Sequence, residues 1–191
     1  MQKKVWMVVF LVVGIILMIG VCAFAELTIG TVEEGYGGGF RAKVGYFMPS
    51  DKDISDFWGS GLIFGGDYVY LFPYKSYGIA GGVDYFTRSQ VEESEGEEIE
   101  VSWTVIPITG SFLYFLTEEK SIYVGAGIGY YSATISAEVE EITISGSESA
   151  LGFHVMGGYN FGKYFGEVKI SSADVKGINA GGISLMIGMS F

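Results

Sequence analysis

The last nine residues alternate between large apolar side chains and mostly small ones. The large apolar residues are Ile183, Leu185, Ile187, Met189 and Phe191, and the small ones between them are Ser184, Gly188 and Ser190. Because successive side chains of a strand point to opposite faces of its sheet, this pattern predicts a β-strand with one apolar face. Such alternation also occurs in the sheets of soluble proteins, so this stretch by itself leaves both classes open.

The same alternation recurs along the chain and predicts seven earlier strands. They cover residues 40–48, 62–72, 77–88, 101–115, 122–136, 150–161 and 164–172. Short turns at 73–76, 116–121 and 162–163 alternate with longer connections: a polar loop at 51–60, acidic loops at 89–100 and 137–148, and a polar loop at 173–180. Pro107 predicts a bulge or another irregularity in the fourth long strand, because proline cannot donate to the ladder. The faces of that strand stay unassigned.

Ionisable side chains fall on the face of each strand that lacks the large apolar residues. We expect eight of them to point inward and to form a polar network: Arg41, Lys43, Asp67, Asp84, Arg88, His154, Glu167 and Lys169. Small residues accompany them, such as Gly125, Gly127 and Gly129 in the fifth strand. A polar, small inner face and an apolar outer face are typical of a transmembrane barrel. A secreted lipocalin-like barrel requires the opposite arrangement.

The composition agrees with a membrane protein whose apolar residues are spread over short strands. Hydrophobic residues make up 49% of the 191 residues, mean hydropathy is +0.39, and there are 30 glycines. Only the first segment is long and apolar enough for a membrane helix. Residues 1–25 resemble a cleaved signal peptide, with Lys3 and Lys4 at the start and Ala23 and Ala25 before the cut. This predicts a single barrel domain over residues 26–191.

Two other interpretations of the first segment stay open. The apolar run is longer than in most signal peptides, which also fits an uncleaved anchor. Cys22 suggests a lipoprotein only weakly, because Val21 stands where a small residue is usual. If cleavage follows Ala25, the mature chain has no cysteine and so no disulfide.

The charge excludes one class of partner. The formal net charge is −11 at pH 7, and removal of Lys3 and Lys4 makes the remaining chain more acidic. A protein that binds nucleic acid needs clustered cations, so we expect no nucleic-acid partner.

Four stretches resemble a known family. Residues 45–51, 59–62, 81–86 and 123–131 are similar to the small eight-stranded outer-membrane β-barrels of the OmpX, OmpW and OmpA-like group. The resemblance covers nearly all of the mature chain and implies an all-β, eight-stranded, antiparallel up-and-down transmembrane barrel in the outer membrane after export. It also implies outer-membrane lipid and lipopolysaccharide as surroundings, periplasmic chaperones during biogenesis, and a monomer. Ile187, Met189 and Phe191 look like the signal that the barrel-assembly machinery reads.

The resemblance and the loop lengths together predict an orientation. With an even number of strands, both ends and the short turns lie on the periplasmic side, and the long connections face outward. Aromatic residues at the short-turn ends of the strands predict an interfacial girdle. They are Phe72, Tyr74, Tyr77, Tyr114, Phe115, Tyr123, Tyr159, Phe161, Tyr164, Phe165 and Phe191.

The sequence leaves several functions open. We expect a non-catalytic barrel with a side-chain-filled interior, in which the charges pair, and with acidic extracellular loops, in a structural or surface-interaction role and without cofactor or metal. An OmpW-like channel for small hydrophobic solutes is the alternative that the resemblance allows. A lipid A acylase or deacylase is a third hypothesis, and His154, the only histidine, would carry it; no serine and acid form a recognisable motif beside it in the sequence. The acidic loops fit no ordered calcium site, and we expect solvated loops.

Overall fold

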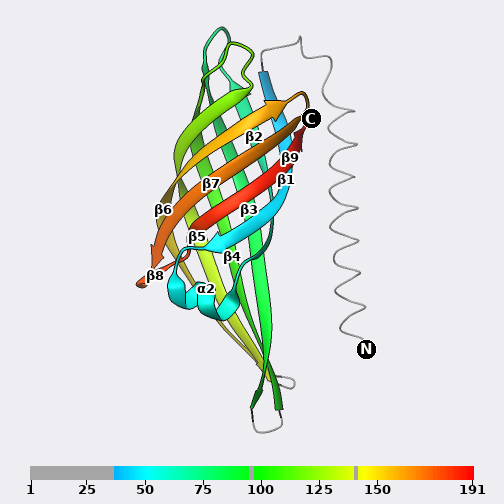
Figure 1. The fold of residues 1–191 in the computed structure, drawn as a ribbon. Helices are drawn as coiled ribbons and strands as arrows, with labels where there is room; N and C mark the ends of the chain where they lie inside the picture. The colour runs from blue at the N-terminus through cyan, green and yellow to red at the C-terminus, as the bar shows by residue number, and fades with distance from the viewer. Residues whose placement is uncertain (1–36, 95–96, 140–141) are drawn as a thin grey trace.

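Eight long antiparallel strands form the wall of a barrel (Figure 1). The computed structural model describes residues 37–94, 97–139 and 142–191, so the predicted signal peptide lies outside the described residues. The wall consists of β1 (Gly37–Pro49), β2 (Gly61–Leu71), β3 (Tyr77–Ser94), β4 (Glu97–Phe115), β5 (Ile122–Val139), β6 (Ile142–Phe161), β7 (Tyr164–Val175) and β9 (Gly182–Ser190). A short helix, α2 (Lys52–Trp58), and a two-residue strand, β8 (Ile178–Asn179), lie at one rim.

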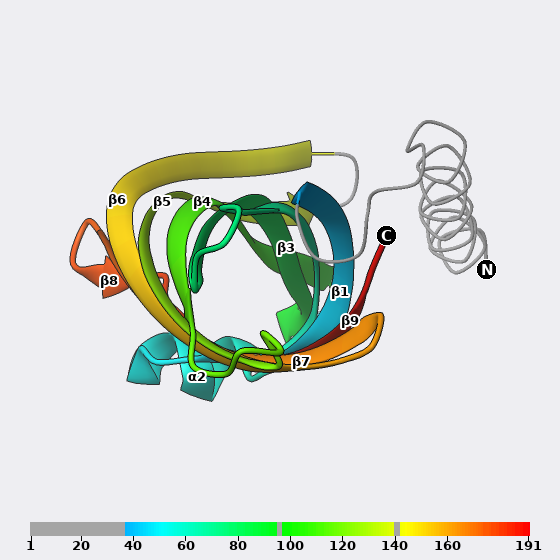
Figure 2. The same cartoon turned by 90° about the horizontal axis from the view of Figure 1, so that it is seen from above.

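The barrel closes because its first and last strands pair with each other. Each strand pairs with the next one along the chain, β6 pairs with β7, β7 with β9, and β9 with β1. Seen from above, the strands therefore form a ring (Figure 2). This topology confirms the predicted eight-stranded, up-and-down, antiparallel fold.

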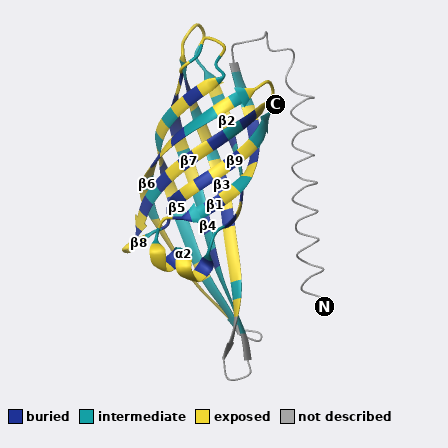
Figure 3. Cartoon of the chain, in the orientation of Figure 1, coloured by how far each residue is buried: buried dark blue, intermediate teal, exposed yellow. Residues whose placement is uncertain are grey.

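The predicted alternation of faces is visible as alternating buried and exposed residues along the strands (Figure 3). Large apolar side chains point away from the barrel, with Leu151 78%, Ile128 71% and Ile187 65% exposed. In the first strand, Arg41 and Lys43 are buried between the exposed residues Phe40 and Val44. A barrel with a polar inside and an apolar outside is suited to a lipid surrounding.

The two ends of the barrel differ. We call the end with the three short turns and Ser190 the turn end, and the opposite end, with α2, β8 and two long hairpins, the hairpin end. The predicted acidic loops are wrong in their extent: β3 runs to Ser94 and β4 starts at Glu97, while β5 runs to Val139 and β6 starts at Ile142. In the second stretch the neighbouring acids hid an alternation of Ile142 and Ile144 with Thr143 and Ser145, and β-branched residues favour a strand.

The predicted polar loop at 51–60 contains a helix that covers the rim. Asp51 caps α2, since its side chain accepts hydrogen bonds from the backbone N–H groups of Asp53 and Ile54. Ile54 and Trp58 are four residues apart, lie on one face of the helix and are buried. Within the part of the chain that the structure describes, no helix is long and apolar enough to cross a membrane.

Pro107 lies at the irregularity that the sequence predicts. The pairs between β3 and β4 skip Ile106 and Pro107 and resume in the same register, so the irregularity is an interruption of the ladder and not a bulge.

The predicted aromatic girdle needs a correction. Three aromatic residues predicted for the girdle, Phe115, Tyr123 and Phe165, are buried inside the barrel.

Candidate functional site

Six charged side chains meet in the middle of the barrel. Arg41 and Lys43 come from β1, Asp67 from β2, Asp84 from β3, and Glu167 and Lys169 from β7, and all six are buried. Alternation places each on the inner face of its strand, and the closed wall brings β7 opposite β2 and β3. Three cations and three carboxylates balance to zero formal charge. We refer to these six residues as the charge cluster.

Arg41 and Asp67 form the best-aligned pair of the charge cluster. The Nε and Nη2 groups of Arg41 donate to Oδ1 and Oδ2 of Asp67 over 2.6 and 3.0 Å. A bidentate guanidinium–carboxylate pair is among the stronger hydrogen-bonded contacts in proteins. Arg41 also donates to the Tyr123 hydroxyl over 3.1 Å, and its guanidinium lies 4.5 Å from the centre of the Phe165 ring. The Arg41 side chain is thereby fixed at several points.

The two lysines extend the charge cluster across the barrel. Lys43 Nζ lies 3.0 Å from Asp67 Oδ2, 3.2 Å from Asp84 Oδ1 and 3.6 Å from Glu167 Oε1. Lys169 Nζ lies 2.7 Å from Asp84 Oδ2. The Tyr123 hydroxyl donates to Glu167 Oε2 over 2.7 Å. Each charge thus has a partner of opposite sign, which offsets the large cost of removing it from water.

Arg88, the fourth arginine or lysine of the predicted network, lies elsewhere. Its side chain is on the inner face of β3 but is exposed near the hairpin end. Its Nε donates to the backbone carbonyl of Trp58 over 3.3 Å. Arg88 therefore links the barrel wall to α2 and does not join the charge cluster.

His154 is buried next to Ser111, a residue that was not among the side chains predicted from the sequence to form the site. Ser111 Oγ lies 2.8 Å from His154 Nε2, and the two residues come from strands that are not neighbours in the wall. His154 Nδ1 has no hydrogen-bond partner among the described residues. A serine–histidine nucleophile needs a third group that orients the histidine and a path for the substrate. This buried pair has neither a carboxylate on Nδ1 nor an open approach.

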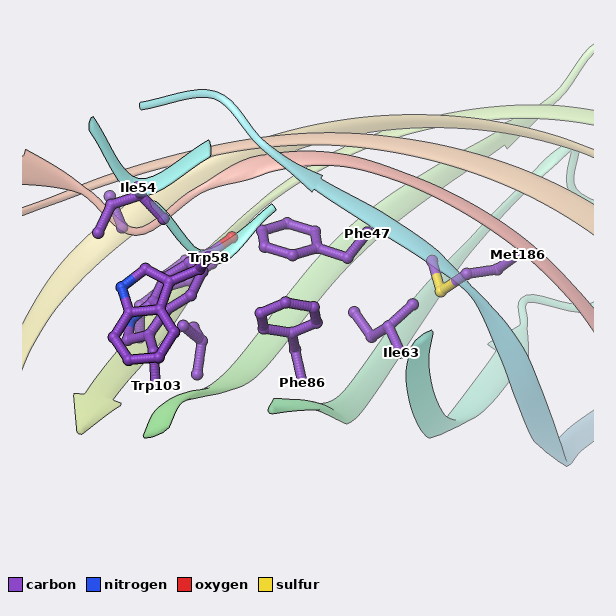
Figure 4. Close-up of a cluster of buried hydrophobic side chains, with 10 residues drawn as sticks. Phe47, Ile54, Trp58, Ile63, Phe86, Trp103 and Met186 are labelled. Atoms are coloured by element: carbon purple, nitrogen blue, oxygen red, sulfur yellow. The ribbon is translucent and has the colours of Figure 1, made fainter. Parts of the chain in front are cut away.

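An aromatic layer lies between the charge cluster and the hairpin end. Phe47, Phe86 and Trp103 pack edge-on or tilted, with ring centres 4.8 to 6.5 Å apart. Ile54 and Trp58 of α2 belong to the same group of buried hydrophobic side chains (Figure 4). The internal void where this layer meets the charge cluster measures about 10 Å³. That is about the space one water molecule needs.

A larger hollow of about 710 Å³ lies against the outer face of the wall. Exposed apolar side chains border it, among them Tyr46, Leu62, Tyr159 and Leu185. It faces the surroundings of the barrel, and most of its lining residues lie on the outer face of the wall. In the described part of the chain, no group of three or more histidine, cysteine, aspartate or glutamate residues is arranged to hold a metal ion.

Two buried residues of this site had a signal in the sequence. Tyr123 has the same parity as the inward-facing glycines of β5, and Phe165 the same parity as Glu167 and Lys169. Alternation alone therefore places both inside the barrel. Ser111 had no such signal, because Pro107 left the faces of its strand unassigned.

The sequence matches no protein-family model and no curated protein with significance. Solved structures are similar in fold. One of them is a structure of Ail, the attachment invasion locus protein of Yersinia pestis, in complex with the heparin analogue sucrose octasulfate. Its TM-score is 0.63 at 15% sequence identity, and the match covers 82% of this chain and all of that one. A second structure of Ail has a TM-score of 0.58 at 12% identity, with the same coverage.

A third structure shows Ail, called an outer membrane protein, in a phospholipid bilayer nanodisc, with a TM-score of 0.48 at 16% identity over 81% of this chain and 99% of that one. The comparison of folds rests on the two Ail structures with the higher TM-scores. At 12% and 15% identity, that likeness shows the fold. The chain has the fold of the small eight-stranded outer-membrane β-barrels.

Proposed function

We propose that this protein is a non-catalytic outer-membrane barrel with a closed interior, which acts through its outer wall and its hairpin end as a structural or surface-interaction protein. The observation that carries the proposal is the filled interior. The charge cluster is neutral and paired, the aromatic layer and α2 cover it, and the void between them measures about 10 Å³. A channel or an active site requires a larger space.

The proposal includes an orientation. The turn end faces the periplasm and the hairpin end faces outward, as in a barrel with an even number of strands and short periplasmic turns. The leader is removed on export, and the chain is a monomer. Ile187, which is 65% exposed, with Met189 and Phe191, which are half-buried, forms the signal for assembly. Phe191 donates its backbone N–H to the Phe40 carbonyl over 2.8 Å, which supports a role at the seam of the barrel.

Single-channel recording in planar bilayers tests the closed interior. The refolded protein is added to the bilayer, and a heat-dependent shift on a gel shows that it is folded. We expect no stable current steps. Regular steps of constant size would contradict the closed interior and favour the OmpW-like channel. A pore protein of known conductance, added to the same bilayer, is the control for detection.

The catalytic alternative has one observation in its favour, the contact between Ser111 and His154. An active-site serine reacts with fluorophosphonate probes, and a buried structural serine does not. We expect no labelling of Ser111 in the folded protein. Labelling that disappears in a His154→Ala variant would establish a nucleophile and overturn the non-catalytic proposal.

A further inference from the structure

Four strands continue beyond the closed part of the barrel at the hairpin end. β3 pairs with β2 as far as Phe86, and β6 pairs with β7 only from Gly152 onward. Beyond these points β3, β4, β5 and β6 still pair with one another, so they form a sheet that projects from the rim. Figure 1 shows these strands extending past α2.

One face of this projecting sheet carries hydroxyl groups in two aligned rows. The pairing register places Thr87, Thr104, Thr134 and Ser147 side by side across the four strands, and Ser89, Ser102, Ser136 and Ser145 in the next row. None of the eight is buried. We call these eight residues the hydroxyl grid. Thr87 contacts Thr104 over 2.9 Å and Thr134 contacts Ser147 over 2.8 Å through their hydroxyl oxygens.

The hydroxyl grid continues the lipid-facing surface. Alternation puts it on the same side of the strands as Tyr85, Ile108, Tyr130 and Leu151, which are 44% to 78% exposed. Thr87 is the next outward residue after Tyr85 on β3, about 7 Å along the strand. In a membrane, the grid therefore lies just outside the apolar layer, at the level of lipid headgroups.

The chemistry of the hydroxyl grid favours a neutral, hydroxylated ligand. A hydroxyl both donates and accepts hydrogen bonds, and so do the hydroxyls of a sugar. The grid contains no charged residue, and the next row outward contains Glu100 and Glu138. Phosphate recognition relies on arginine or lysine, and acidic neighbours oppose it. Headgroup phosphates are therefore poor ligands for this surface.

We propose that the hydroxyl grid binds neutral sugar units of glycolipids in the leaflet around the hairpin end. The proposal rests on the outward orientation of that end given under the proposed function. It commits to a ligand that is anchored in the same membrane, because the grid continues the lipid-facing wall.

Methyl NMR of the protein in nanodiscs tests the proposal directly. Threonine methyl groups are labelled with ¹³C, and spectra are compared in phospholipid alone, with lipid A, and with lipopolysaccharide that carries neutral sugars. We expect the signals of Thr87, Thr104 and Thr134 to shift only with the sugar-bearing lipid. Thr109, which lines the internal void, is the internal control and stays unchanged. Equal shifts with lipid A, or no shifts at all, would overturn the proposal.

Variants separate binding from folding. Thr104→Val with Thr134→Val removes two hydroxyls and keeps the shape and the strand preference of the side chains. Because a hydrogen bond contributes about 1 kcal/mol net, we expect affinity for sugar-bearing lipopolysaccharide to fall about tenfold or more. Thr143→Val, on the same face in the acidic row, is the matched control and keeps the wild-type affinity. Equal affinities of the double variant and the wild type would contradict a role of the grid.

A separate measurement distinguishes this proposal from the proposed function. A Ser147→Cys variant is labelled with an impermeant maleimide on intact cells. Labelling together with a negative NMR result would refute only the sugar site. If the cysteine reacts only after the outer membrane is opened, the orientation and the sugar site are both wrong.

Discussion

Arg41 and Asp67 face each other across the β1–β2 pair, and two hydrogen bonds of 2.6 and 3.0 Å join their side chains inside the barrel. Lys43 approaches the same carboxylate at 3.0 Å. Asp67 thus lies nearest to both cations of β1, while Asp84 and Glu167 contact them over 3.2 to 3.6 Å.

Asp67→Asn keeps the shape of the side chain and removes this charge. Because an uncompensated buried charge is costly, we expect the free energy of unfolding to fall by about 3–5 kcal/mol. Urea unfolding of the refolded protein in detergent, followed by tryptophan fluorescence, measures this loss. Glu148→Gln is the control, since Glu148 pairs with Lys176 on the surface and such a pair contributes about 0–1 kcal/mol. Similar losses in both variants would contradict the importance of the charge cluster.

Ser111→Ala removes the hydrogen-bond partner of His154 Nε2. The imidazole is then buried without a partner on either nitrogen, and we expect a loss of about 1–3 kcal/mol in the free energy of unfolding. Equilibrium unfolding measures it. Ser172→Ala, a half-buried serine on the outer face of β7, is the control and changes stability little. A stability of Ser111→Ala equal to that of the wild type would mean that the contact is not stabilising.

Trp58 and Phe57 are neighbours in α2 but differ in environment: Trp58 is 4% exposed and Phe57 is 39% exposed. Removing a buried aromatic side chain costs about 3–5 kcal/mol where the site is fully packed. We therefore expect Trp58→Ala to loosen the hairpin end much more than Phe57→Ala does. Hydrogen exchange of the α2 amides reports this difference. Equal exchange rates in the two variants would show that α2 is not held by Trp58.

The Asp51 side chain joins α2 to the segment that precedes β9. The stability of α2 should therefore depend on pH. Hydrogen bonds from the backbone N–H groups of Asn179, Ile54 and Asp53 lower the pKa of the Asp51 carboxyl. The stabilisation is complete above the ordinary aspartate pKa of about 3.9 and is lost as the pH falls through the lowered folded value. We expect the α2 amides to exchange faster in acid, relative to their intrinsic rates.

Two variants provide the controls for the pH dependence of α2. Asp51→Asn still accepts the capping hydrogen bonds but cannot be protonated in this range, so its exchange protection should not change with pH. Asp51→Ala loses the cap at every pH, with a cost of about 1 kcal/mol. A pH effect that persists in Asp51→Asn would show that another group titrates.

The wall of the barrel could be predicted from the sequence because one strong physical requirement acts on every strand. A lipid-facing wall needs an apolar side chain at every second position, so residues such as Leu151 and Ile187 reveal both the strand and its face. The inward direction of Arg41, Lys43, Asp67, Asp84, Glu167 and Lys169 follows from the same parity. The distances between these side chains depend on the stagger between strands. The alternation along each strand gives no information about that stagger.

The hairpin end was predicted less well because several weaker requirements act there. Strands that leave the membrane no longer need an apolar face, so hydroxyl and acidic residues replace the alternation that marks the wall. Ile54 and Trp58 show a helical spacing, but a segment of seven residues between two strands is too short for a clear periodic pattern. Arg88 has the parity of an inward residue and yet lies beyond the charge cluster. Parity tells which face a side chain is on, but it does not tell how far along the barrel the side chain lies.

The unbroken pairing of β4 with β5, from Ile99 and Val139 to Phe115 and Tyr123, has a mechanical consequence. The hydrogen bonds of an antiparallel ladder run perpendicular to the strands. A pull on the hairpin tips along the strand axis therefore loads many of these hydrogen bonds in shear at once. They resist together, whereas a pull perpendicular to the strands would break them one after another. Tension applied at the tips is therefore passed along this ladder to the closed part of the wall.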